Sequence, residues 1–175
     1  ERPSRTPMVG TDAMLAALDP VLRGYLEVPE ALAADKITQG RAALDRLATT
    51  ATNVVPEGSS KSAELWDKIA SSLIGNARKA HRAEADAEVR LAFEDMNEPM
   101  TRLLSQFGNP LAESLQTAFC PMAFDNRGAG WIQRTGSVAN PYCGAAMLRC
   151  GEVSATLAPG ERLARSVAGG AAPSQ

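Results

Sequence analysis

The sequence is poor in the residues from which catalytic sites are usually built. It holds one histidine, His81, and three cysteines among 175 residues, and aromatic residues make up 5% of the chain. A catalytic triad needs a base beside a serine or cysteine nucleophile, and no such partner lies near His81 in the sequence. We therefore expect a protein that is not an enzyme, with His81 in a surface or capping role at the junction of two helices.

Blocks of positive charge and long apolar runs are also absent. The formal net charge is −2, which disfavours nucleic acid and anionic membrane surfaces as partners. No apolar run approaches the ~20 residues that a membrane-spanning helix needs, so we expect no membrane insertion. The chain begins at Glu1 rather than at a methionine, and we expect a processed product or a domain of a longer protein.

Helical patterns fill the first part of the chain. Hydrophobic residues make up 45% of the sequence, and abundant alanine and leucine favour helices. The sequence predicts a first helical arm that begins after residue 10, followed by helices over 38–50, over 62–80 and from residue 86 onward. The last of these carries the clearest apolar stripe: Val89, Phe93, Met96, Met100, Leu103 and Phe107. Such a seam is typical of an antiparallel helix bundle, and Pro99 should bend the helix without moving this face.

Glycine, proline and asparagine interrupt the chain between residues 109 and 151, where the helical period fades. Residues 115–119 and 152–157 are candidates for short strands. We nevertheless predict an all-α fold, an up-down bundle of about four helices with a short irregular cap. The expected organisation is a linker over 1–10, the bundle over 11–108, the cap of the same domain over 109–157, and a flexible tail over 158–175.

The predicted cap contains five sulfur atoms, in Cys120, Met122, Cys143, Met147 and Cys150. If residues 144–150 are helical, the offsets of four and seven place Cys143, Met147 and Cys150 on one face. Thiolates and thioethers are soft ligands that suit Cu(I), whereas thiolates alone would suit Zn(II). A Cu(I) site needs only two or three such ligands, so this set is sufficient without histidine.

Other interpretations of these residues stay open on the sequence alone. Cys120 and Cys150 are also suited to a disulfide that closes a loop of about thirty residues, worth ~3–4 kcal/mol by the chain-entropy argument. The cysteines are alternatively inert buried residues, and Met122 and Met147 ordinary core side chains. These alternatives predict a structural cap rather than a metal site.

Several uncommon residues recur in the order typical of one known family. They are Cys120-Pro-Met-Ala123, Gly128, Trp131, Asn140-Pro-Tyr142, Gly144, Met147-Leu148 and Cys150-Gly-Glu-Val153, with Tyr25-Leu26, residues 31–35, Arg90 and Phe93 upstream. Over about residues 11–153 the chain resembles the DUF3347 family, which occurs alone or at the C-terminus of periplasmic adaptor subunits of copper, silver and other heavy-metal efflux pumps of the resistance-nodulation-division class. An aromatic residue more often occupies the position of Cys143, whose thiol is then either a third ligand or a neutral replacement.

The resemblance implies a periplasmic or otherwise exported protein whose partners are components of an efflux adaptor or pump. Together with the sulfur atoms, it predicts a domain that binds a soft metal ion, first of all Cu(I) and only second Zn(II). The first ligands expected are Cys120, Cys150 and Met122, followed by Met147 and Cys143. The alternative function is a structural or interaction module that carries a Cys120–Cys150 disulfide and docks on an adaptor or a pump.

Overall fold

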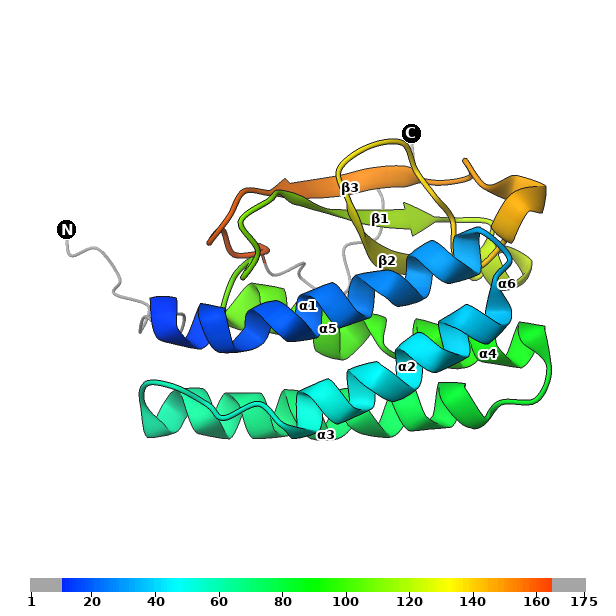
Figure 1. Ribbon diagram of the computed structural model, residues 1–175. Coiled ribbons are helices and arrows are strands. Elements are labelled where there is room, and N and C mark those ends of the chain that lie inside the picture. The colour runs from blue at the N-terminus through cyan, green and yellow to red at the C-terminus, as the bar shows by residue number, and fades with distance from the viewer. Residues whose placement is uncertain (1–10, 165–175) are drawn as a thin grey trace.

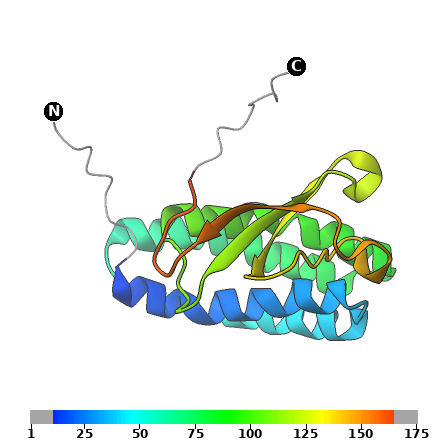
Figure 2. The ribbon, with the colours of Figure 1, turned by 90° about the horizontal axis from the view of Figure 1, so that it is seen from above.

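The computed structural model describes residues 11–164, in which helices and a small sheet form separate layers (Figure 1). The helices are α1 (Asp12–Ala33), α2 (Ile37–Thr52), α3 (Ser60–Arg82), α4 (Asp86–Glu94) and α5 (Asn97–Gln106). The strands are β1 (Leu115–Cys120), β2 (Ala129–Arg134) and β3 (Glu152–Leu157), with a short helix α6 (Ala123–Asn126) after β1 and a 3₁₀ turn η1 (Gly144–Met147) before β3. Strand β2 packs on α1, α4 and α5, and Figure 2 shows the sheet from above, lying over the helices.

The predicted all-α fold is wrong, because residues 115–157 contribute a three-stranded antiparallel sheet with the order β2-β1-β3. The two candidate strands of the sequence are β1 and β3, whereas β2 was missed. Its six residues are buried or half-buried throughout, so they lack the alternation of apolar and polar residues by which a strand is recognised. The helical part agrees with the predicted four helices when α4 and α5 are counted together as the fourth.

The helices begin where the sequence supplies capping side chains. The Thr11 hydroxyl accepts a hydrogen bond from the Met14 N–H, and Ser59 does the same for Ser62, both at 3.2 Å. These caps satisfy backbone donors that have no partner inside the helix. Helix α1 continues through Pro20 and buries ten of its residues. Among residues 11–164, no helix is long and apolar enough to cross a membrane.

The predicted fourth helix is broken, although its apolar face is not. All six residues of the stripe are at most 1% exposed, but α4 ends at Glu94 and α5 begins at Asn97. Pro99 explains the break, because a proline ring clashes with the carbonyl four residues earlier, which is that of Asp95. The Asp95 carbonyl instead accepts a hydrogen bond from the Asn76 side chain at 3.2 Å. The chain thus keeps the same face in the core across the break.

Strand β1 is the centre of the sheet. It pairs with β2 from Leu115 opposite Arg134 to Cys120 opposite Ala129, and with β3 through Phe119 opposite Glu152. A β-bulge between Thr117 and Ala118 shifts the register with β3. In Figure 1, β3 is the strand farthest from the helices, and most of its residues are exposed.

Aromatic side chains join the two layers. The Phe93 ring on α4 lies 5.7 Å from Tyr25 of α1 and 5.8 Å from Tyr142, measured between centroids. Trp131 of β2 meets Tyr142 edge-on at 5.9 Å, and the Tyr25 hydroxyl accepts a hydrogen bond from the Ile132 N–H. Because these side chains are buried and belong to both layers, the helices and the sheet share one hydrophobic core.

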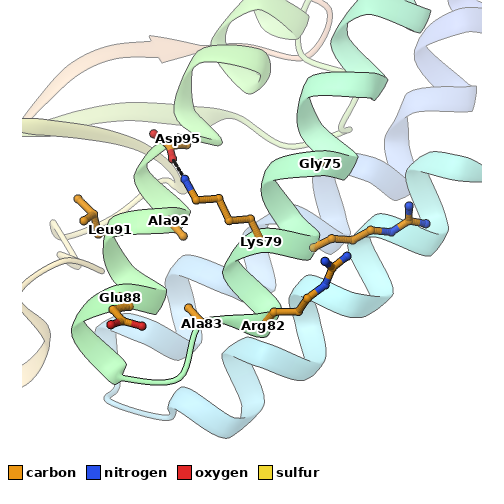
Figure 3. Close-up of a pocket in the computed structure, with 9 residues that line it drawn as sticks. Gly75, Lys79, Arg82, Ala83, Glu88, Leu91, Ala92 and Asp95 are labelled. Carbon is orange, nitrogen blue, oxygen red and sulfur yellow. Dashed lines mark hydrogen bonds and ion pairs between the residues drawn. The ribbon is translucent and has the colours of Figure 1, made fainter.

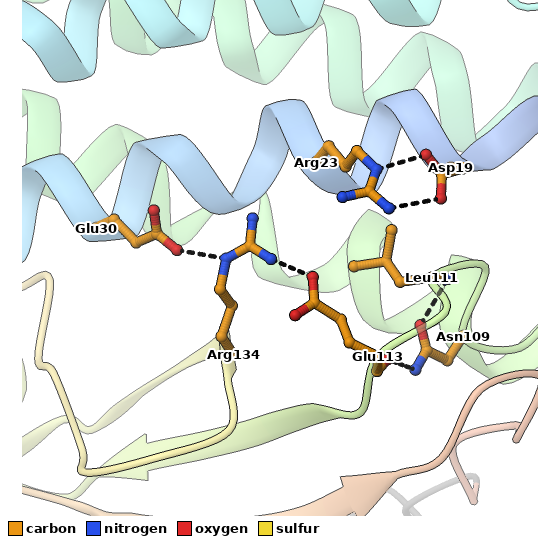
Figure 4. Close-up of polar contacts among 7 residues, drawn as sticks. All are labelled: Asp19, Arg23, Glu30, Asn109, Leu111, Glu113 and Arg134. Carbon is orange, nitrogen blue, oxygen red and sulfur yellow. Dashed lines mark hydrogen bonds and ion pairs between the residues drawn. The ribbon is translucent and has the colours of Figure 1, made fainter.

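Polar contacts attach one end of the sheet, where Leu115 pairs with Arg134, to helix α1 (Figure 4). Arg134, at the end of β2, pairs with Glu30 of α1 at 2.9 Å and with Glu113 in the loop before β1. The buried Asn109 side chain donates to the Glu113 carbonyl and accepts from the Leu111 N–H. Exposed ion pairs contribute ~1 kcal/mol or less each, so these contacts mainly orient the sheet.

Candidate functional site

Two of the predicted ligands, Cys120 and Cys150, lie side by side. Cys120 is the last residue of β1, and Cys150 comes two residues before β3 begins. Because the strands are antiparallel and Phe119 faces Glu152, the two cysteines meet at the same end of the sheet. Their sulfur atoms are 3.1 Å apart, and both thiols are free. Cys120 is fully buried, whereas Cys150 is only half-buried.

Gly151 permits this approach. Its φ of +120° lies in the region that favours glycine, and a Cβ there would come within 2.8 Å of the Phe119 carbonyl oxygen. The backbone between Cys150 and β3 can therefore pass close to the end of β1. The sequence Cys150-Gly151 places a thiol directly before this crossing.

Asn140 closes the loop that leads to Cys150. Its side chain is fully buried, and its oxygen accepts hydrogen bonds from the N–H groups of Tyr142 and Cys143 at 2.8 and 3.0 Å. Its amide nitrogen donates to the Cys150 carbonyl at 2.9 Å, and its backbone N–H donates to the Leu148 carbonyl. Buried amides that satisfy this many partners fix a loop in one conformation.

The two adjacent thiols differ in acidity. Burial alone would raise the pKa of Cys120, but hydrogen bonds from the Cys150 thiol, the N–H groups of Met122 and Ala123, and the Asn140 side chain outweigh it and lower the pKa. The same contact with Cys120, followed by desolvation, raises the pKa of Cys150 to about 11. As the pH rises, Cys120 is therefore the first of the two to become a thiolate.

The third cysteine, Cys143, lies near this pair, immediately before η1. Its pKa is raised first by burial and then by the negative charge of the Cys120 sulfur, so the two side chains are close enough to interact. Within residues 11–164, however, no group of three or more cysteine, histidine, aspartate or glutamate side chains is arranged to hold a metal ion. The unit that the fold assembles is thus the Cys120–Cys150 pair with Cys143 beside it.

An ion pair fastens the cysteine-bearing loop to the helices. Arg90 of α4 donates to the Asp35 carboxylate at 2.6 Å, to the Leu32 carbonyl and to the Pro141 carbonyl. The other Asp35 oxygen accepts a hydrogen bond from the Ala145 N–H at 3.1 Å. We call this set of contacts the Asp35–Arg90 clamp. Sequence reasoning assigned no role to either residue, although both belong to the positions that carry the family resemblance.

Comparison with known proteins places the helical layer in a family. The model of the family described as "Protein of unknown function (DUF3347)" matches residues 21–111, just over half of the chain. The chain belongs to the DUF3347 family. The match covers most of α1 through the loop before β1, and therefore includes both residues of the Asp35–Arg90 clamp but none of the cysteines. No curated protein and no solved structure matches the chain.

The two predicted methionine ligands of this DUF3347 domain lie on its surface. Met122 is 53% exposed and Met147 is 40% exposed. The condition that residues 144–150 are helical is not met beyond Met147, because the 3₁₀ turn η1 ends there. The helical face that was to align Cys143, Met147 and Cys150 is consequently not formed. The cysteines are instead brought together by strand pairing.

A groove opens beside the cysteine pair. It has a volume of about 420 Å³, and its lining includes Cys150, Glu152 and the apolar side chains of Phe119, Pro121 and Val153. Phe119 and Val153 are 45% and 39% exposed. One of the two thiols therefore borders an accessible, mostly apolar surface, while Cys120 lies beneath it.

A larger groove of about 700 Å³ runs between α3 and α4 (Figure 3). Its polar lining includes Arg78, Lys79 and Arg82, and Lys79 pairs with Asp95 across the groove at 3.4 Å. The residues that line this groove include no thiol or imidazole, so they offer neither a nucleophile of that kind nor a soft metal ligand.

His81 helps to connect two helices of the helical layer, α2 and α3. Its Nδ1 lies 2.9 Å from the Arg41 carbonyl oxygen, and the Arg41 side chain donates to the carbonyl oxygens of His81 and Glu84. These contacts join α2 to the C-terminal end of α3, where arginine satisfies carbonyls that the helix leaves without partners. Arg41 therefore caps the C-terminal end of α3, and His81 contacts the backbone of Arg41.

Proposed function

We propose that this DUF3347 domain handles a soft metal ion, with Cu(I) bound between the sulfur atoms of Cys120 and Cys150. The proposal includes an exported location and a role in heavy-metal efflux or resistance, in which the domain passes the ion to an adaptor or pump or shields it. The observation that carries it is that the pairing of β1 with β3 brings two free thiols together, one of which ionises more readily than an ordinary cysteine.

Ligand number favours Cu(I) over Zn(II). Two soft sulfur ligands are sufficient for Cu(I), whereas structural Zn(II) sites almost always use four protein ligands. Cys143 is the nearest further thiol, and Met122 and Met147 offer exposed thioethers on the same cap. We propose that these three residues assist the entry or release of the ion rather than hold it at rest.

Proton competition gives the proposed site a pH dependence of known sign. Metal ligation requires thiolates, and the pKa of Cys150 is about 11, so binding at neutral pH displaces its proton. Apparent affinity should therefore rise with pH. It should fall more steeply on acidification once Cys120 also takes up a proton.

The test is a competition titration of the reduced protein with Cu(I) and a chromophoric chelator. We expect Cys120→Ser and Cys150→Ser to weaken binding by more than ~100-fold, beyond the loss typical of residues that only orient a ligand. Met122→Leu and Met147→Leu should cost about tenfold or less. Cys143→Ser is the matched control that removes a thiol outside the pair. Unchanged affinity in the Cys120→Ser/Cys150→Ser double variant would falsify the metal proposal.

The second candidate is the structural module with a Cys120–Cys150 disulfide. It is favoured by the sulfur separation of 3.1 Å, because two thiolates on a tetrahedral zinc ion lie about 3.8 Å apart and a disulfide bond is about 2.05 Å long. A disulfide here would stabilise the domain by ~3–4 kcal/mol. A purified protein that retains this bond and takes up no copper would support the structural candidate over the metal proposal.

A further inference from the structure

The two sulfur atoms of the cysteine pair differ in their access to solvent. Cys120 is fully buried, whereas Cys150 is half-buried and borders the groove next to Phe119 and Val153. A thiolate that attacks a disulfide must reach one sulfur atom directly, and access determines which sulfur it attacks. Of these two sulfur atoms, only that of Cys150 can be approached from the groove.

Access therefore sets the roles of the two sulfur atoms in a disulfide between them. An external thiolate that attacks the accessible Cys150 sulfur breaks its bond to the buried Cys120, so Cys120 is the sulfur that leaves.

We propose that the groove beside Cys150 is a thiol–disulfide exchange site for small thiols. An external thiolate attacks the Cys150 sulfur of the Cys120–Cys150 disulfide, forms a mixed disulfide there and releases Cys120 as a thiolate. A second external thiolate attacks the external sulfur of that mixed disulfide and releases Cys150. The domain gains two electrons, the two external thiols become one external disulfide, and the reverse sequence reoxidises the pair. The proposal requires the two cysteines but no metal ion.

The charge of the groove selects among thiols. Glu152 is exposed and is the charged residue of the lining, which otherwise presents Phe119, Pro121, Val153 and Ser154 beside the thiol. A carboxylate near the reacting sulfur attracts cations and repels anions, more strongly at low salt. The site should therefore react faster with cationic thiols and disulfides than with anionic ones.

The first experiment compares the two sulfurs in reaction with cystamine, a small cationic disulfide. In a Cys143→Ser background, the variant that keeps only Cys150 should form the mixed disulfide at least ~10-fold faster than the variant that keeps only Cys120. In concentrated guanidinium chloride the two rates should become about equal, which confirms that the folded structure causes the difference. Equal rates in native buffer, or faster reaction of Cys120, would overturn the proposal.

A further experiment uses the protein with all three cysteines in place. The oxidised protein is treated with cysteamine, quenched with acid, alkylated and mapped by mass spectrometry. We expect the adduct on Cys150 and the alkyl group on Cys120. An adduct mainly on Cys120, or no Cys120–Cys150 disulfide after oxidation, would overturn the proposal.

The second experiment tests the charge of the groove with Glu152→Gln. In this variant, the rate of mixed-disulfide formation with cationic cystamine, divided by the rate with anionic dithiodiglycolate, should be several-fold lower than in wild type at low ionic strength. Glu57→Gln, in the loop before α3 and outside the groove lining, is the matched control and should leave the ratio unchanged. An unchanged ratio in Glu152→Gln would refute the proposed selectivity. Since no measurement involves copper, these results are independent of whether the metal proposal holds.

Discussion

Gly144 allows the loop that carries Cys143 to lie against the Asp35–Arg90 clamp. Its φ is +61°, and a Cβ at this position would collide with the Asp35 carboxylate and the Arg90 guanidinium. Gly75 on α3 has neither constraint, because a Cβ added there would meet no atom within 4 Å and its backbone is helical. The same residue type is thus required at one position and merely tolerated at the other.

Substitution of these two glycines by alanine should have opposite effects on stability. Gly144→Ala should lower the free energy of unfolding by ~1–3 kcal/mol through backbone strain and displacement of the clamp. Gly75→Ala should raise it by ~0.5–1 kcal/mol, because alanine is the better helix former. Urea denaturation of both variants measures the difference. A Gly144→Ala protein as stable as wild type would show that the loop is not held in this conformation.

At the scale of elements, the Asp35–Arg90 clamp connects the C-terminal end of α1, α4 and the loop that precedes η1. The Ala145 N–H, and after it the Arg90 guanidinium, holds the pKa of Asp35 below its ordinary value of 3.8. Because the folded-state pKa is the lower one, this carboxylate stabilises the fold above the ordinary value. The contribution is lost as the pH falls through the folded-state pKa.

Asp35→Asn should remove this dependence on pH. Near neutral pH we expect the variant to be less stable than wild type, because the charge-assisted contacts with Arg90 are lost. The difference should shrink as the pH falls below about 4, where wild type also loses its carboxylate charge. Urea midpoints of both proteins across this range test the prediction, and hydrogen exchange of the Ala145 amide reports on the loop itself. A difference that stays constant down to low pH would contradict it.

At the scale of the whole molecule, the helical and sheet layers share one core, and each contains a buried tryptophan. Trp66 on α3 and Trp131 on β2 are 2% and 1% exposed. The aromatic contacts of Phe93 with Tyr25 and Tyr142 cross the boundary between the layers. Layers with a common core are expected to unfold together.

The tryptophans allow this cooperativity to be measured. In a Trp66→Phe variant, fluorescence reports only on Trp131 in the sheet, whereas circular dichroism at the helical band reports mainly on α1 to α5. We expect the two urea transitions to coincide within error, as in a two-state protein. Trp131→Phe provides the complementary signal from α3. Loss of the Trp131 signal at lower urea than the helical signal would show that the sheet is a separate folding unit.

The sequence by itself determined the helical layer and much of its core. The stripe from Val89 to Phe107 is local, since residues three and four apart share a face in any helix, and all its members are buried as predicted. The family, too, could be recognised from the residues. The ends of β1 and β3 agree closely with the two candidate strands, because short runs between turn residues are visible in the chain.

Only the tertiary structure decided that these strands form a sheet and that Cys120 meets Cys150. Pairing between β1 and β3 joins residues that are 33 to 42 positions apart, from Phe119 with Glu152 to Leu115 with Leu157, and no local period encodes which strands become neighbours. The contrast between buried Cys120 and half-buried Cys150 is likewise visible only in the folded chain, where Asn140 and Gly151 fix the loop beside the end of β1. Spacing alone suggested a helical face of sulfurs, whereas antiparallel pairing between β1 and β3 brings the two thiols together.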